Sequence, residues 1–88
     1  MDLRRVDLNL LVALEALLDE GGVTRAGKRL NLSQSAVSAT LDRLRQLFDD
    51  PLLVRVGNAM EPTAFALELQ GPLKTALASV SLALSLPQ

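Results

Sequence analysis

The chain has 88 residues, a net charge of −1, and neither cysteine nor histidine. This length suits one small core, and the missing residue types exclude disulfide bonds, thiol catalysis and the common zinc sites. Apolar residues make up 49% of the sequence but aromatic residues only 2%, so the core has to consist of leucine, valine and alanine, which favours packed helices.

The first half of the chain predicts three helices. Asp7 can cap a helix over residues 8–19, in which leucines recur every three or four positions, and Gly21 and Gly22 end it. A short second helix starts at residue 23 or 24 and ends at 30; after the turn at 31–32, Ser33 caps a third helix that ends near Phe48. Two helices joined by a turn of about four residues predict a helix-turn-helix.

The third helix has two contrasting sides. Val37, Leu41 and Leu44 are spaced to form one apolar face, which we expect in the core. The rest of its surface carries short side chains that both donate and accept hydrogen bonds, which is typical of a helix that approaches another polymer closely. These polar residues are Gln34, Ser35, Ser38, Thr40 and Asp42.

The second half predicts a hairpin and a long helix. Residues 52–56 are apolar and β-branched, Gly57 and Asn58 form a turn pair, and residues 59–61 return antiparallel. Pro62 ends this wing, and Thr63 caps a helix from 64 to about 86, which Gly71 and Pro72 are expected to kink. The predicted fold is therefore mainly α: a winged helix-turn-helix domain over residues 1–62, with three helices and a two-stranded wing, followed by a linker helix over residues 63–88.

The linker helix carries more apolar surface than one small domain can cover. We therefore predict that it forms a homodimer with its own copy. A membrane span is the weaker interpretation, because Glu68, Gly71, Pro72 and Lys74 interrupt the helix and the apolar run after them is shorter than the roughly 20 residues a bilayer requires. The predicted dimerisation stripe is Leu69, Leu73, Leu77, Val80 and Leu84.

Charge is unevenly distributed along the chain. Residues 1–24 hold two bases and five acids, whereas residues 25–45 hold five bases and one acid. A local basic segment on a helix-turn-helix suits phosphate binding. Arg25, Lys28 and Arg29 are interpreted first as a solvated helix face, with diffuse attraction to DNA as the alternative. Arg43 and Arg45 could pair with nearby aspartates instead of phosphate.

Five segments in order carry a resemblance to a known family. They resemble the amino-terminal domain of LysR-type transcriptional regulators, and the resemblance covers nearly the whole chain. The segments are Asp7–Leu11, Val23–Ala26, Leu32–Ser38, Asp50–Arg55 and Met60–Thr63.

The resemblance implies sequence-specific binding to double-stranded DNA, with the recognition helix over residues 33–47 in the major groove. It also implies a homodimer, paired through the linker helix, on a pseudo-palindromic bacterial promoter site, and a protein of the bacterial cytoplasm that acts at the nucleoid. Tetramers and a small-molecule inducer belong in the family to a C-terminal domain that this chain lacks. The chain is then either an excised fragment or a naturally short protein, and we favour the fragment. No cofactor is expected.

The resemblance also assigns site residues. Gln34 is the best candidate for reading a base, because a primary amide can bond bidentately to adenine N6 and N7. Base readout is carried over to Gln34, Ser35, Ser38, Ala39 and Thr40. Phosphate contact is carried over to Thr24, Ser33, Arg43, Arg55, Asn58 and Thr63.

The chain departs from the family pattern at four positions. Gly22 replaces a usual serine, and Gly27 replaces a usual alanine, which is expected to weaken the second helix by about 1 kcal/mol. Ala39 and Asn58 stand where many members have longer or basic side chains. Direct readout is therefore sparse, and affinity is expected to depend on DNA shape and on having two copies.

Two other functions fit the sequence less well. A small dimeric module that binds proteins is disfavoured, because the polar face of the third helix lacks the aromatic and aliphatic anchors of protein interfaces. An enzyme is disfavoured further, because no histidine or cysteine is present and no serine lies near an obvious base.

Overall fold

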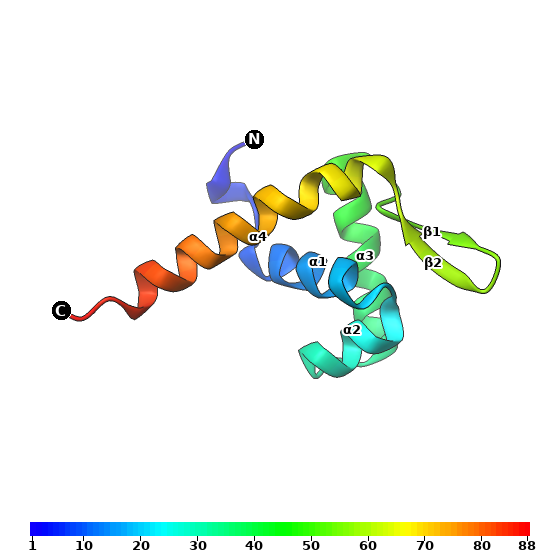
Figure 1. The fold of residues 1–88 in the computed structure, drawn as a ribbon, viewed down its shortest axis with the longest axis horizontal. Helices are drawn as coiled ribbons and strands as arrows, with labels where there is room; N and C mark the ends of the chain where they lie inside the picture. The colour runs from blue at the N-terminus through cyan, green and yellow to red at the C-terminus, as the bar shows by residue number, and fades with distance from the viewer.

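The computed structural model describes residues 1–88 as four α-helices and a two-stranded antiparallel sheet (Figure 1). The winged helix-turn-helix prediction is confirmed, and a short 3₁₀ turn at Leu3–Arg5 is an additional element that the sequence did not predict. The elements are α1 (Leu8–Glu20), α2 (Val23–Leu30), α3 (Gln34–Phe48), β1 (Leu53–Val56), β2 (Ala59–Pro62) and α4 (Ala64–Ser85).

Three helices begin at the residues predicted to cap them. The Asp7 side chain accepts a hydrogen bond from the Asn9 amide at 2.9 Å, and the hydroxyls of Ser33 and Thr63 each accept one at 3.1 Å from the amide three residues later. Such caps satisfy backbone donors that have no partner within the helix. At the other ends, Gly21 and Asn31 adopt the left-handed conformation that closes α1 and α2.

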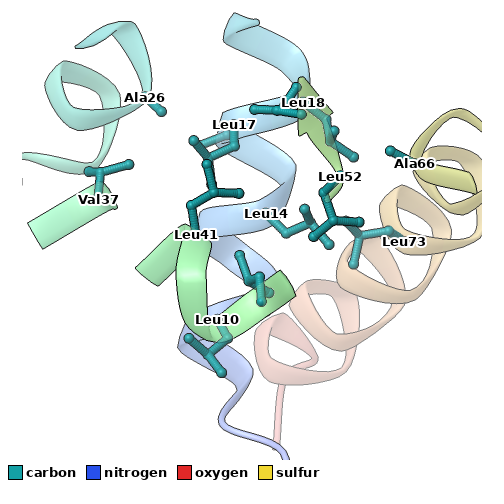
Figure 2. Packing of buried hydrophobic residues seen from close by; sticks show 13 residues of the cluster. Leu10, Leu14, Leu17, Leu18, Ala26, Val37, Leu41, Leu52, Ala66 and Leu73 are labelled. Atoms are coloured by element: carbon teal, nitrogen blue, oxygen red, sulfur yellow. The ribbon is translucent and has the colours of Figure 1, made fainter. Parts of the chain in front are cut away.

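The core lies where α1 meets α3, the loop before β1 and the first half of α4. Figure 2 shows Leu14 of α1, Leu52 of the loop and Leu73 of α4 meeting in this cluster. Val37, Leu41 and Leu44 of α3 are buried as predicted. Their burial fixes the roll of α3 and turns its polar side outward.

Part of the predicted dimerisation stripe belongs instead to this core. Leu73 is only 5% exposed, and Leu69 and Leu77 are partly buried against the same cluster. Leu73 is therefore a core residue that offers little surface to a partner, whereas Leu69 and Leu77 can offer only the exposed part of their side chains. Val80 and Leu84 are 41% and 84% exposed and remain available to a partner.

The α4 helix runs without interruption through Pro72 and, in Figure 1, projects away from the other helices toward the C-terminus. Its first half nevertheless shares the core of the preceding domain through Ala66 and Leu73. The predicted boundary after residue 62 therefore divides the winged helix-turn-helix from the linker helix by their expected functions, but the two parts share one core. None of the helices combines the length and hydropathy needed to cross a bilayer.

Gly27 has a packing role that the sequence analysis did not identify. A Cβ at this position would lie 2.9 Å from the Leu32 carbonyl oxygen and 3.5 Å from a Val37 methyl group. Glycine thus permits the close approach of α2 to the turn that follows it, beside its lower helix propensity.

An ion-pair cluster joins three helices at one edge of the domain. Asp19 of α1 accepts from Lys74 of α4 at 2.6 Å and from Arg29 of α2 at 3.0 Å, and it also accepts from Gln70. Arg29 additionally reaches Glu15 and Glu20 at 3.4 Å. The hydrogen bond from Lys74 is the main reason that the pKa of Asp19 is lowered; desolvation, the next largest effect, opposes it, and hydrogen bonds from Arg29 and Gln70 add to the lowering.

This lowered pKa predicts an acid-sensitive contribution to stability. The folded state holds fewer protons on Asp19 than the unfolded state does, so its contribution is present above the ordinary carboxyl pKa of about 3.9 and is lost as the pH falls through the folded value. At neutral pH we expect Asp19→Asn to lower the free energy of unfolding by about 1 kcal/mol, and this difference should shrink below pH of about 4.

Urea denaturation at a series of pH values measures this difference. Asp49→Asn is the matched control, because Asp49 is exposed, makes no ion pair and lies in a left-handed conformation that asparagine also adopts. A constant difference between wild type and Asp19→Asn at all pH values would contradict the prediction.

Candidate nucleic-acid interface

The outward side of α3 begins with four exposed residues. Gln34, Ser35, Ser38 and Ala39 lie on the side opposite or adjacent to the buried valine and leucines, given the rotation of about 100° per residue. Ser38 makes no hydrogen bond within the protein, whereas the Ser35 hydroxyl lies 3.3 Å from that of the capping Ser33. The structure thus brings four of the five predicted base-reading residues to one continuous surface.

Thr40 is separated from these four. Its side chain is half-buried, and its hydroxyl donates to the Ala36 carbonyl at 3.0 Å. It lies outside the roughly 140° arc that the other four residues span, about 100° beyond Ala39. Its hydroxyl hydrogen serves the helix itself, so Thr40 is poorly placed for base readout.

A concavity of about 410 Å³ lies between the start of α2, the start of α3 and the wing. It brings together residues that are far apart in sequence. Five predicted site residues line it: Thr24, Gln34, Ser38, Arg55 and Asn58. Arg25 also lines it, although the sequence analysis treated this residue as part of a solvated face.

Hydrogen bonds order one side of the concavity. The Gln34 amide donates through Nε2 to the Thr24 hydroxyl at 3.0 Å, which joins the first turn of α3 to the first turn of α2. The N-terminus of α2 itself has no side-chain cap, because Gly22 occupies that position. Sequence reasoning missed the contact between Thr24 and Gln34, since ten residues separate them.

The arginines between residues 25 and 55 fall into two groups. Arg29 belongs to the ion-pair cluster, and Arg45 donates to the carbonyls of Pro51 and Leu53 and pairs with Asp42 at 3.3 Å. These two therefore hold the fold together. Arg25, Arg43 and Arg55 are exposed and make no ion pair or side-chain hydrogen bond within the protein, so their full charge faces solvent.

Thr63 has a structural role that competes with phosphate binding. Its hydroxyl accepts from the Ala66 amide and donates to Asp50 Oδ2 at 2.7 Å. A phosphate oxygen requires a donor, so it would have to displace Asp50. Ser33 is less constrained, because its hydroxyl caps α3 as an acceptor and shares only a 3.3 Å contact with Ser35.

The surface offers groups suited to recognition by hydrogen bonds and charge. Hydroxyl, amide and guanidinium groups gather around the concavity. No three side chains of the metal-ligating types converge so that they could hold an ion. The arrangement can therefore donate to phosphate oxygens and exchange hydrogen bonds with base edges.

Curated proteins are similar to this chain in sequence. The transcriptional activator NagR of a Ralstonia species is 47% identical over 85 residues, which are 97% of this chain and 28% of that protein. Nodulation protein D 1 of Bradyrhizobium elkanii is 44% identical over 84 residues, or 96% of this chain and 27% of that protein. The chain thus spans little more than a quarter of the length of these relatives.

Solved structures agree with these matches. The crystal structure of a probable transcriptional regulator from Pseudomonas aeruginosa superposes with a TM-score of 0.87 at 43% identity, covering 94% of this chain and 28% of that one. The DNA-binding domain of BenM, in a complex with benA site 1 DNA, has the same fold with a TM-score of 0.83 at 21% identity, covering 91% of this chain and 90% of that one.

The family assignment rests on the greater part of the chain. Residues 8–67 match the profile of the family described as bacterial regulatory helix-turn-helix protein, lysR family. This range runs from the first residue of α1 through the wing into α4. Together with the helix-turn-helix geometry and the relatives above, the match shows that the chain belongs to the lysR family of bacterial regulatory helix-turn-helix proteins.

Proposed function

We propose that this chain is a sequence-specific DNA-binding domain of a bacterial transcriptional regulator, with α3 as the recognition helix in the major groove. The observation that carries the proposal is the outward side of α3. It presents exposed hydroxyl and amide groups beside three arginines, Arg25, Arg43 and Arg55, whose charges are not neutralised by the protein. Hydroxyl and amide groups can bond to base edges, and arginines can bind phosphates.

The division of roles follows from these contacts. Gln34, Ser35, Ser38 and Ala39 are proposed to meet base edges. Ser35 would do so at the start of the helix, and the Ala39 methyl group suits contact with a thymine methyl. Arg43 and Arg55 are proposed to bind phosphates on either side, and Ser33, Thr24 and Asn58 to add hydrogen bonds. The relatives are named as regulators and one neighbour in fold was solved with DNA, which supports the same function here.

We propose further that two copies act together on a pseudo-palindromic site. Exposed apolar side chains remain on the last turns of α4, and exposed Leu8 and Val12 lie on α1, so a second chain has apolar surface to cover. The exposed apolar residues at this end of α4 are Val80, Leu82, Leu84 and the C-cap residue Leu86. Assembly into tetramers and response to an inducer would belong to a longer protein of the size of the relatives.

A module that binds proteins has less support. Its interface would need aromatic anchors, but Phe48 and Phe65, the two aromatic residues of the chain, pack against each other with ring centroids 5.9 Å apart. Neither is on the outward side of α3. The DNA-binding proposal uses the polar groups that this side does present.

Selection from a pool of random duplexes tests the proposal. The wild-type chain should enrich an inverted repeat and lose affinity steeply with salt, since each neutralised phosphate contributes a slope of about −0.9 in log–log form. Gln34→Ala should lower the affinity for the enriched site by about 1–3 kcal/mol and relax the preference at one position of each half-site.

Gln46→Ala is the matched control, because Gln46 has the same side chain on the same helix, is exposed, and lies roughly 18 Å along the axis from Gln34. It should leave the enriched sequence unchanged. No enrichment by the wild type, even at low salt, would contradict sequence-specific binding.

A further inference from the structure

We infer that Thr24 is a positioning residue that fixes which way the Gln34 amide faces, and thereby sets the base that Gln34 prefers. The inference rests on the DNA-binding function proposed above. It starts from one contact, the 3.0 Å hydrogen bond from Gln34 Nε2 to Thr24 Oγ1 across the helix-turn-helix. The Gln34 amide has no other hydrogen-bond partner in the protein.

The chemistry of a primary amide makes this contact consequential. The amide has two N–H donors on one side and one acceptor oxygen on the other, so a rotation of half a turn exchanges donors for acceptor. A hydroxyl can bind either end of the amide, but once Thr24 donates its own hydrogen to a phosphate oxygen it can only accept from Gln34 Nε2, and the amide oxygen then points the other way. One N–H and the oxygen stay free, and these are the two groups that an adenine edge requires.

Without this contact the amide loses its fixed orientation. An exposed glutamine can rotate about its terminal bond and then offer donors to guanine or thymine acceptors as readily as it offers its oxygen to adenine. The Thr24 hydroxyl therefore does not read sequence itself. With its hydrogen donated to a phosphate, it accepts only from an amide N–H and so disfavours the flipped orientation in which Gln34 would bind the wrong base.

Thr24 is well placed to hold this role. It lies on the first turn of α2, and both residues line the concavity between α2, α3 and the wing. Because Thr24 accepts from Gln34 and donates to no protein group, its own hydroxyl hydrogen is free for a phosphate oxygen. The Thr24 hydroxyl can thus contact the DNA backbone and orient the Gln34 amide at the same time.

Comparing base preferences among variants tests the inference. Thr24→Val keeps the shape of the side chain but removes the hydroxyl, and Thr24→Ser keeps the hydroxyl. In duplex selection, Thr24→Val should reduce the preference for the favoured base over the other bases by about 3- to 10-fold, which matches the typical cost of fixing one flexible side chain. The reduction should occur only at the base position that Gln34→Ala relaxes. Thr24→Ser should retain the wild-type preference.

The double variant separates positioning from phosphate contact. In the Gln34→Ala background, Thr24→Val should change no base preference further and should lower affinity equally for all sequences. A Thr24→Val protein that keeps the full wild-type preference while binding every sequence more weakly would overturn the inference, because Thr24 would then contact phosphate alone. If wild type itself enriched no sequence, the proposed function would fail before this comparison began. Circular dichroism of each variant verifies folding.

Discussion

Replacing Leu73 by alanine is expected to lower the free energy of unfolding by about 2–4 kcal/mol. Leu73 lies on α4 but is 5% exposed and packs in the core with Leu14 and Leu52 (Figure 2). Truncation removes buried apolar surface and leaves a cavity between α4 and α1, and both effects destabilise the fold. Urea denaturation at several protein concentrations measures the loss.

Leu84→Ala provides the contrast, because Leu84 is 84% exposed on the same helix. It should change the stability of the fold by less than about 0.5 kcal/mol but weaken self-association, which analytical ultracentrifugation measures. If the loss in Leu73→Ala disappeared as the protein concentration rose, Leu73 would belong to a dimer surface after all.

Asp50→Ala is the second variant with a large expected effect. One carboxylate oxygen, Oδ2, accepts from the Leu52 amide at 2.8 Å and from the Thr63 hydroxyl at 2.7 Å. Leu52 is fully buried in a left-handed backbone conformation with φ of 64°, which costs a non-glycine residue about 1–2 kcal/mol. The carboxylate therefore holds a strained turn and the start of α4 at the same time.

Loss of this carboxylate leaves two donors without their partner. Since hydrogen bonds to a charged group contribute about 1.5–3 kcal/mol each and neighbouring bonds are not additive, we expect Asp50→Ala to cost about 2–4 kcal/mol. Thermal and urea unfolding measure it. Asp42→Ala is the control, because the Asp42 side chain is 71% exposed and makes a single ion pair; a cost for Asp50→Ala no larger than that of this control would refute the role.

Local chemistry made most element boundaries predictable. Asp7, Ser33 and Thr63 each mark a helix start, and their capping bonds depend only on residues two or three positions away. The hairpin was predicted within one residue at each strand end, since a glycine-asparagine pair specifies a tight turn.

Long-range packing set the limits of prediction. The α4 helix has leucines on most of its surface, so periodicity alone did not show that Leu73 faces α1 while Leu84 faces solvent. The same limit applies to the candidate site. Residue types indicated Gln34, but only the fold shows that Thr24 holds its amide and that Arg29 and Arg45 are occupied by contacts within the protein.

The attachment of α4 determines where the chain can bend. Asp50 clamps the start of α4 to the end of α3, Lys74 ties it to α1, and Leu77 is its last residue that packs on the core. From residue 78 onward every side chain is exposed. The first half of α4 is therefore fixed to α1 and α3 by packing and by these polar contacts. We expect α4 to bend most easily beyond residue 77, where no side chain packs on the core.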